Sequence, residues 1–379
     1  MVTAAFLLAA ALVAPESSPA VPPPPDGPTA EEAEAGIAKG LRYLLESQNE
    51  DGSWGGTRNV TFTSSFANPA TYHTWQVGTT GLACRALLEL GPDEARAATA
   101  RGLDWLSAHA ELVRPAEWDL DNNWGLIYGL FAFAGALRHP SFDEAAKEGW
   151  RDAARRMADG LKEYQSPRGG WGYYADPNAH WRPDWATSFT TAAGVLALLD
   201  AKAAGVPVDE KVLAAAVRAV SRARLPNGAY DYDVSAVPRH FRLESINQVK
   251  GSLGRIQVGN VALRRAGAEL PDGAVEEGLE QFFRHHKFLE VARNKPIPHE
   301  AYYANAAYFY LFGHYYAGCA LLETRDSRRP GWAVRLRREV LKCQQDDGSM
   351  WDFWIAHNTK AYGTAFGVLA LAKTLEATN

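Results

Sequence analysis

The sequence predicts an all-α protein: a closed (α/α)6 toroid in which six outer helices surround six inner helices. Two observations carry this prediction. A turn motif recurs at a regular spacing, and amphipathic helical segments alternate with segments that are apolar on every side. The chain has 379 residues, 47% of them hydrophobic, and is therefore long enough to bury a core of this size.

The turn motif combines a Gln, an Asp-Gly or related pair, and an aromatic residue. Its copies begin at residues 48, 165, 224 and 344, of which the copy at 224 is weaker and has Arg224 in place of the Gln, so successive copies lie 117, 59 and 120 residues apart. These spacings are two, one and two units of a period near 59, and six units account for the chain from about residue 26. The two remaining units, whose turns are expected near Ser107 and Arg284, keep the spacing but have lost the motif.

We assign the motif a structural role. The Gln is expected to bond free backbone groups at helix ends, and the Trp to pack over neighbouring helix termini. The residues assigned to it are Gln48, Asp51, Gly52, Trp54, Gln165, Gly169, Trp171, Gln344, Asp347, Gly348 and Trp351.

The helical segments fall into two kinds. Segments ahead of the turns are amphipathic, as expected of outer helices with one solvent face; they are residues 33–48, 143–165, 209–224 and 331–345. The inner segments are apolar all round, and they include residues 80–87, 124–137, 191–198, 253–266, 306–322 and 364–371. An open solenoid is the alternative, but six units without a distinct capping repeat favour a closed ring.

The N-terminus and the composition limit the location and the partners. Residues 1–25 resemble a signal peptide followed by a Pro-rich linker, so we expect an exported protein with one toroid domain over residues 26–379. A net charge of −5 without a basic run predicts no nucleic-acid binding, and no strong membrane anchor is expected. The three cysteines, Cys84, Cys319 and Cys343, form no C-x-x-C pair and are expected to be buried.

The motifs resemble those of a known superfamily. Q-x-x-D-G-S-W turns ahead of glycine- and alanine-rich segments look like the QW motifs of the squalene cyclase and protein prenyltransferase toroids. The stretches "NNWGLIYGL", and "GHYYAGCALL" followed by "CQQDDGSMW", also resemble exported single-toroid squalene-cyclase-like proteins of planctomycete-type bacteria. The resemblance implies a central cavity that binds an apolar or isoprenoid-type ligand.

The resemblance also implies a catalytic acid. Squalene-hopene-type cyclases protonate an alkene with the middle Asp of D-x-D-D, which aligns here with Asp119-Leu-Asp121-Asn122. Asp121 then corresponds to the acid, and nearby Asp119 is expected to raise its pKa. The last acid of the pattern is replaced by Asn122, and the alternative is that Asp121 or Asn122 only caps a helix.

A zinc site of the prenyltransferase type is not predicted. That site needs Asp-x-Cys, and Leu82, Ala317 and Leu341 stand two residues before the cysteines. His314 matches the third ligand by itself, while His285, His286 and His299 are expected on the surface or in loops. We therefore expect no metal and no cofactor.

Aromatic residues of the inner segments are the candidates for a ligand cavity. Tyr308, Phe312 and Tyr315 share one helical face, and their rings could line an isoprenoid tunnel or stabilise a cation. The alternative is plain ring packing, with His314 as a satisfied core residue. The full set of candidates is Tyr308, Phe312, His314, Tyr315, Trp124 and Tyr128.

Three functions stay open at this point: a ligand-binding toroid, a terpenoid cyclase that uses Asp121, and a polysaccharide hydrolase or lyase on an (α/α)6 barrel. The last requires paired acids along a groove, and it rests on fold analogy alone. Its candidate acids are Asp119, Asp121, Asp231, Asp233 and Glu300, with Trp54, Trp118 and Trp181 as sugar platforms.

Overall fold

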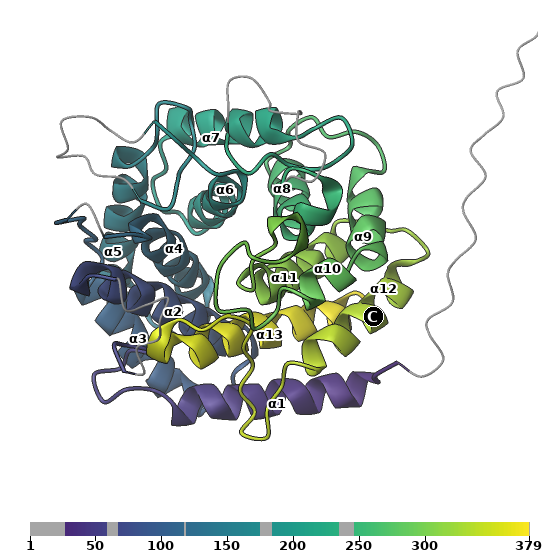
Figure 1. Cartoon of the computed structure of the whole chain (residues 1–379). Helices are drawn as coiled ribbons and strands as arrows, with labels where there is room; N and C mark the ends of the chain where they lie inside the picture. Colours follow the sequence, from purple (N-terminus) through teal and green to yellow (C-terminus); the bar gives the residue numbers. More distant parts are fainter. Residues whose placement is uncertain (1–26, 59–66, 117–118, 175–183, 235–245, 379) are drawn as a thin grey trace, which may run out of the picture.

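The computed structural model describes residues 27–58, 67–116, 119–174, 184–234 and 246–378. Within these ranges it has an inner and an outer ring of helices, as predicted (Figure 1). The inner helices are α2 (Pro69–Leu90), α4 (Asn122–Arg138), α6 (Ser188–Ala203), α8 (Leu253–Arg265), α11 (Phe309–Leu322) and α13 (Thr359–Glu376). The outer helices are α1 (Ala30–Glu46), α3 (Ala95–Ala108), α5 (Glu144–Glu163), α7 (Glu210–Ala223), α9 (Ala274–Arg284) and α12 (Arg329–Leu341).

Short elements complete the described structure. A single helical turn, α10 (Lys287–Glu290), follows α9, and 3-10 turns span Val249–Gly251, Tyr302–Ala304 and Ala356–Asn358. The signal-peptide-like segment and the linker lie outside the described residues. None of the described helices is both long enough and apolar enough to cross a membrane.

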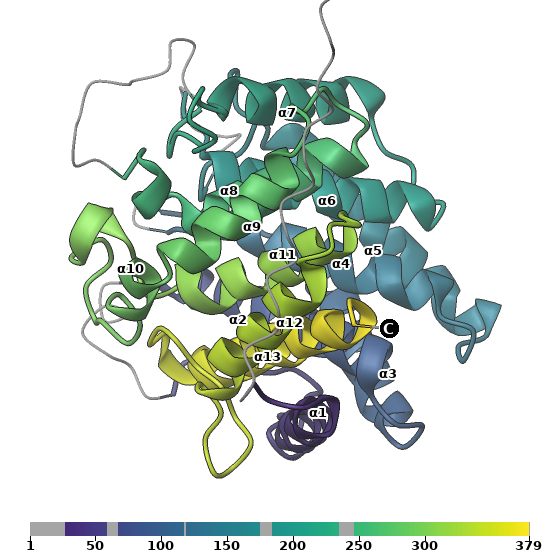
Figure 2. The same cartoon turned by 90° about the vertical axis from the view of Figure 1, so that its right-hand side faces the viewer.

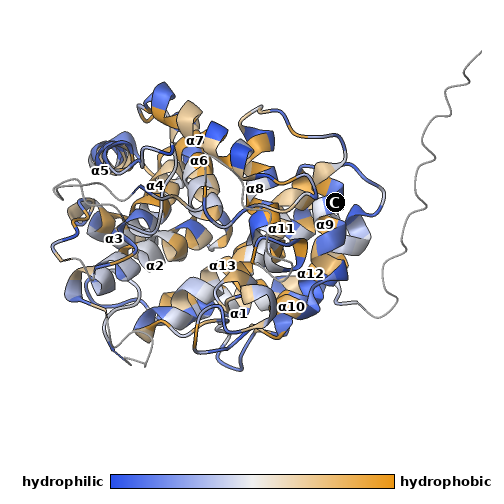
Figure 3. Ribbon diagram, turned by 45° about the horizontal axis from the view of Figure 1, so that its top comes forward, coloured by the Kyte–Doolittle hydropathy of each residue, from blue (hydrophilic) through white to orange (hydrophobic). Residues whose placement is uncertain are grey.

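The ring is closed by the two ends of the chain. Each inner helix packs against the next one, and α13 packs against α2. Each later outer helix packs on the inner helix that precedes it in the sequence, whereas α1 packs on α13 (Figures 1 and 2). Only one face of each outer helix is buried: the buried residues of α5 and α7 are mostly apolar and the exposed ones mostly polar. Figure 3 colours much of α5 blue, for hydrophilic residues. The prediction of a closed toroid is confirmed.

The motif glutamines join neighbouring outer helices. The Nε2 of Gln48 donates to the carbonyl of Ala98 in α3 at 2.7 Å, and that of Gln165 donates to Val212 in α7 at 2.8 Å. Gln344 donates to Gly36 in α1 at 2.8 Å, and so links the last outer helix to the first. Each amide also donates to a carbonyl of its own turn, so these hydrogen bonds fix the turn and the ring together.

The motif tryptophans are fully buried rather than laid over the surface. The indole N–H groups of Trp54 and Trp171 donate to the carbonyls of Leu44 and Leu161 in the preceding outer helices, at 2.7 and 2.8 Å. A Cβ on Gly194 would lie 2.8 Å from the Trp171 ring, which explains the glycine in that inner helix.

The fourth motif copy departs from this pattern. Its buried position is taken by Met350, whose backbone N–H donates to Thr364 Oγ1 at 2.8 Å. Trp171 occupies the same place in its copy, where its N–H donates to Thr191 Oγ1 at 3.1 Å. Trp351 is only half-buried and packs against Trp354. The assignment of Trp351 to the core position is therefore corrected to Met350.

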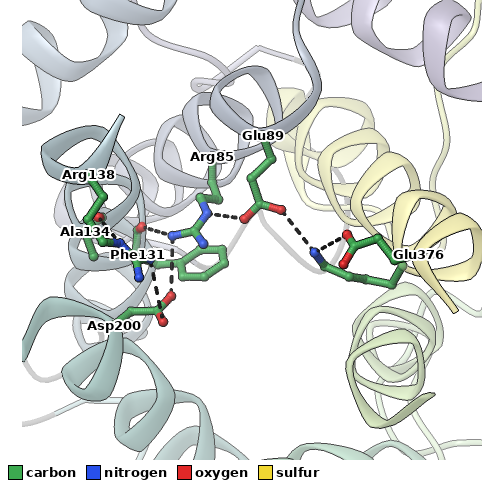
Figure 4. Close-up of polar contacts among 8 residues, drawn as sticks. Arg85, Glu89, Phe131, Ala134, Arg138, Asp200 and Glu376 are labelled. Carbon is green, nitrogen blue, oxygen red and sulfur yellow. Dashed lines mark hydrogen bonds and ion pairs between the residues drawn. The ribbon is translucent and has the colours of Figure 1, made fainter. Parts of the chain in front are cut away.

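Ion pairs tie the C-terminal ends of four inner helices (Figure 4). The guanidinium of Arg85 in α2 lies 4.0 Å over the Phe131 ring and donates to Glu89, to the Phe131 carbonyl and to Asp200 in α6. Lys373 of α13 pairs with the same Glu89 at 3.5 Å. Since Arg85 is only 8% exposed, these contacts compensate a charge that is almost removed from water.

Candidate functional site

A cavity of about 470 Å³ lies inside the ring, and five of the six inner helices, all except α8, contribute lining residues, mostly from their N-terminal halves. Aromatic residues dominate its walls. They are Trp75, Trp124, Tyr128, Tyr173, Phe189, Tyr308, Phe309, Phe312, Phe353, Trp354, Tyr362 and Phe366. The lining thus suits an extended apolar ligand and offers several π faces to a cation.

Four of the six predicted cavity residues line this space: Tyr308, Phe312, Trp124 and Tyr128. Trp124 stacks on Tyr128 with 5.5 Å between ring centroids, and Phe312 meets the edge of Trp124 at 6.0 Å. The rings therefore form a connected wall rather than isolated contacts.

Tyr315 and His314 do not line the cavity. Tyr315 lies one turn further along α11, where it borders a separate space of about 20 Å³ together with Arg265 and Cys319. His314 is fully buried, because two residues after Phe312 a helical side chain points to almost the opposite face. The placement of these two residues in the ligand cavity is wrong.

Asp121 points into the cavity and does not cap its helix. It precedes α4 with a φ of 68°, in the left-handed region, and its side chain makes no capping hydrogen bond. Its Oδ2 instead accepts the indole N–H of Trp75 at 2.7 Å. A non-glycine residue in this conformation is uncommon, and here the backbone turns the carboxyl group toward the ligand space.

The surroundings of Asp121 favour its protonated form. Burial raises the pKa of the carboxyl group to about 6, while the hydrogen bond from Trp75 lowers it. Asp119 is not among the causes of this shift. The group is therefore a carboxylic acid through mildly acidic pH, in apolar surroundings where its proton has few other acceptors.

Asp119 has a structural role. It is 3% exposed and does not line the cavity. Its Oδ1 accepts the backbone N–H and the hydroxyl of Thr71, both at 3.2 Å, and its Oδ2 accepts the N–H of Ala116 at 3.1 Å. These bonds hold the start of α2 against the loop that carries Asp121, so the expected coupling of the two acids is replaced by a positioning role.

A histidine and two tyrosines of the cavity wall, His299, Tyr308 and Tyr173, are linked to Tyr232, which lies behind the lining. The Nδ1 of His299 lies 2.7 Å from the carbonyl of Ala304, so it carries the proton, and Nε2 accepts the Tyr308 hydroxyl at 2.9 Å. Tyr232 also reaches Nε2 at 3.3 Å, and its hydroxyl contacts that of Tyr173. Burial lowers the pKa of His299, which keeps this network neutral.

A further buried acid, Asp352, supports the cavity from outside. Asp352 is fully buried; its Oδ2 accepts the N–H of Leu311 at 2.7 Å, and its Oδ1 accepts the hydroxyl of Tyr362, which lines the cavity. Burial raises the pKa of Asp352 to about 6. Asp352 was not among the predicted site residues, although its position directly after the fourth motif copy was an available signal, and His299 was expected only on the surface or in a loop.

The carbohydrate-site candidates are not brought together. Asp231 and Asp233 do not line the cavity, and Glu300 is exposed. Trp54 is fully buried and offers no face to a sugar, while Trp118 and Trp181 lie outside the described residues. Among the described residues that line the cavity, Asp121 is the only carboxylate.

Comparisons with known proteins extend this picture at the level of the fold. No family model matches the sequence, and no curated protein matches it. A variant of the type II terpene cyclase MstE from Scytonema, bound to its product merosterolic acid A, shares the fold with a TM-score of 0.56 and 13% identity, over 92% of this chain and 98% of that one.

Other solved structures share the fold to the same degree. An α-1,6-mannanase from Salegentibacter matches with a TM-score of 0.57 and 10% identity, over 91% of this chain and 99% of that one. A D-mannose isomerase matches with a TM-score of 0.58 and 12% identity, over 92% and 98%. The chain therefore has the α/α-toroid fold of terpene cyclases and of several carbohydrate enzymes, and its site must decide between their chemistries.

Proposed function

We propose that this protein binds an isoprenoid-type ligand in its aromatic cavity and cyclises or isomerises it, with Asp121 as the acid that protonates an alkene. One observation carries the proposal. The carboxyl group of Asp121 is turned into an aromatic cavity by a left-handed backbone, and burial keeps it protonated to about pH 6. A helix cap would need none of these properties.

The chemistry follows from the groups at the wall. The Asp121 O–H donates its proton to one carbon of a C=C bond, and the π electrons form the new C–H bond. The other alkene carbon becomes a cation, which a second alkene attacks to close a ring. Transfer of a proton from the final cation to water restores a neutral product, and the Asp121 carboxylate regains a proton from water, so substrate and product are isomers.

The cavity supports both partners of the proton transfer. The Trp75 N–H, 2.7 Å from Oδ2, stabilises the carboxylate that remains at Asp121. The faces of Trp124, Tyr128 and Phe312 stabilise the cation without acting as strong nucleophiles.

The comparisons support the choice of ligand class. MstE, which shares this fold, has been solved with geranylgeranyl dihydroxybenzoate as its substrate. The QW-type turns favour the same superfamily, and we propose that the chain belongs with its exported single-toroid members. The apolar run at residues 4–14 supports export. A glycoside hydrolase on this fold would need a second carboxylate at the cavity, and the described lining offers none.

The test is incubation of the full chain with squalene, geranylgeraniol and longer polyprenols at pH 5.5, followed by mass spectrometry and chromatography of the lipid extract. Wild type is expected to convert at least one of them to an isomer, and Asp121→Asn to convert none. Asp93→Asn, at a side chain that is 90% exposed, is the matched control and should behave as wild type. No product from wild type, or equal product from Asp121→Asn, contradicts the proposal.

A further inference from the structure

A cluster of His and Glu side chains lies apart from the cavity, where α10 and α12 both pack on α11. The flank of the toroid that carries α9, α10 and α12 faces the viewer in Figure 2. His286 directly precedes α10 and Glu290 ends it, so the two side chains are four residues apart on one face of a helical turn. Glu339 comes from α12, 49 residues further on in the sequence. One ligand atom from each of the three residues lies within 4.8 Å of the others.

His314 fixes the tautomer of His286. The Nδ1 of His314 lies 2.6 Å from the carbonyl oxygen of Tyr310, which can only accept, so Nδ1 carries the proton. The Nε2 of His314 is then an acceptor, and the Nε2 of His286, at 2.9 Å, must donate to it. In a neutral His286 ring the remaining nitrogen, Nδ1, holds only a lone pair.

Two carboxylates lie near that lone pair. The nearest charged oxygen to His286 Nδ1 is Oε2 of Glu339 at 3.9 Å, and Glu290 completes the group. A lone pair and two anionic groups around one point attract a cation, and Lys342 and Arg293 supply part of that positive charge. We propose that His286, Glu290 and Glu339 bind a divalent transition-metal ion of the Zn²⁺ type.

The donor set and its surroundings fit such an ion. One imidazole nitrogen and two carboxylate oxygens are ligands that Zn²⁺ accepts, and they leave a fourth position for water. His314 and Tyr310 supply outer contacts: the first orients His286, and the second donates its hydroxyl to Glu290 Oε2 at 2.9 Å. The ligand atoms lie within 4.8 Å of one another, and binding would draw them to about 3.4 Å, the separation set by zinc bonds of about 2.1 Å in a tetrahedral site.

Two cations already contact the carboxylates. Arg293 pairs with Oε1 of Glu290 at 3.1 Å, and Lys342 pairs with Oε2 of Glu339 at 2.7 Å. The side chain of Lys342 is 50% exposed and can turn to solvent, and Arg293 contacts the oxygen of Glu290 that faces away from Tyr310. The ion therefore displaces Lys342 alone.

The site is separate from the proposed chemistry. None of its three ligands lines the central cavity, and they come from the segment of α10 and from α12, so the role of the ion is to fasten α10 to α12. Such a bond adds stability to the folded chain in proportion to metal saturation. The sequence did not predict this site, because two ligands come from a single helical turn and the third from a helix that only the fold brings near.

The test uses untagged full-length protein, stripped with chelator and titrated with ZnCl₂ by calorimetry and with CoCl₂ by absorption spectroscopy. Wild type is expected to bind one Zn²⁺ per chain, to show d–d bands of Co²⁺ bound to N and O ligands, and to unfold at a higher temperature with Zn²⁺ present. Glu339→Gln and His286→Gln should each weaken binding at least tenfold. Glu277→Gln, an exposed carboxylate on α9, should bind as wild type does.

Far-ultraviolet circular dichroism of the metal-free variants checks that each is folded. The variant His314→Gln provides a second measurement. It removes an outer contact and should weaken Zn²⁺ binding by 10- to 100-fold without changing the stoichiometry. Absence of a stoichiometric site in wild type, or equal affinity of wild type and both ligand variants, overturns the proposal.

Discussion

The indole N–H of Trp75 donates to Oδ2 of Asp121 at 2.7 Å, and this bond joins the first inner helix to the residue that precedes the second. It holds the carboxyl group toward the cavity in place of a helix-capping bond. It also sets the strength of the acid, since a donor to the carboxylate lowers the pKa that burial has raised.

Replacement of Trp75 by Phe should shift the pH dependence of product formation. Asp121 donates its proton only when protonated, so the wild-type rate falls as the pH rises through about 6. Trp75→Phe keeps the ring but removes the donor, so the pKa of Asp121 rises and the fall moves to higher pH. The measurement is kcat against pH for both proteins. A fall at the same pH in both would show that Trp75 does not control the acid.

Asp121→Asn should stabilise the fold at high pH while it abolishes turnover. The raised pKa means that the folded state binds the proton more tightly than the unfolded state does. The contribution of protonated Asp121 to the free energy of unfolding is therefore fully present below about pH 4 and is lost as the pH rises through about 6. Removal of the charge should restore about 1–3 kcal/mol at pH 8 and almost nothing at pH 4.

Urea unfolding of wild type and Asp121→Asn at the two pH values measures this difference. The amide oxygen still accepts from Trp75, and Asn tolerates the left-handed backbone well, so the variant should stay folded. A stability difference that is equal at pH 4 and pH 8 would mean that the carboxyl group is not desolvated in the cavity.

Gly78→Leu should block the cavity without harm to the fold. Gly78 lines the cavity, and a Cβ at this position would have its nearest neighbours at an ordinary 3.7 Å. We expect at least tenfold weaker binding of geranylgeraniol by native mass spectrometry, and unchanged or slightly higher stability because a helical glycine is replaced. Gly149→Leu, on the exposed face of α5, is the matched control. Equal affinity in both variants would place the ligand elsewhere.

Gln344→Ala should loosen the closure of the ring. The variant loses the hydrogen bond to Gly36 and leaves two carbonyls without this donor, at a cost of about 1–3 kcal/mol of unfolding free energy. Gln345→Ala changes the exposed neighbour, whose amide bonds only within its own turn, and should cost less than about 0.5 kcal/mol. Chemical denaturation compares the two, and equal losses would contradict the joining role of Gln344.

The architecture was predictable because the repeat encodes it locally. The turns at Gln48, Gln165 and Gln344 each bring a Gln and a glycine followed by a buried side chain, Trp54, Trp171 or Met350, so their spacing was enough to count the units. Residue boundaries were less accessible: α2 begins at Pro69, ahead of the predicted apolar stretch, since Thr71 is anchored by Asp119 rather than by a local pattern.

Only those site residues could be predicted that a local motif or the periodicity of one helix identifies. Asp121 and Phe312 follow from a motif and from helical periodicity. His299, Asp352 and Trp75 act through partners on other helices, and the contact between His286 and His314 joins residues 28 positions apart. The local sequence does not predict such pairs, because their members come together only when the ring of helices closes.

The most direct test of the central claim is turnover in D₂O. The carboxyl proton of Asp121 exchanges with solvent before it is transferred to the alkene, so in D₂O the cyclised product should gain one deuterium on carbon. The label is seen as a mass shift of about one unit and lies at the protonated carbon. We expect this label in the wild-type product and no product from Asp121→Asn. A product without deuterium, or an identical labelled product from the variant, would contradict the role of Asp121 as the acid.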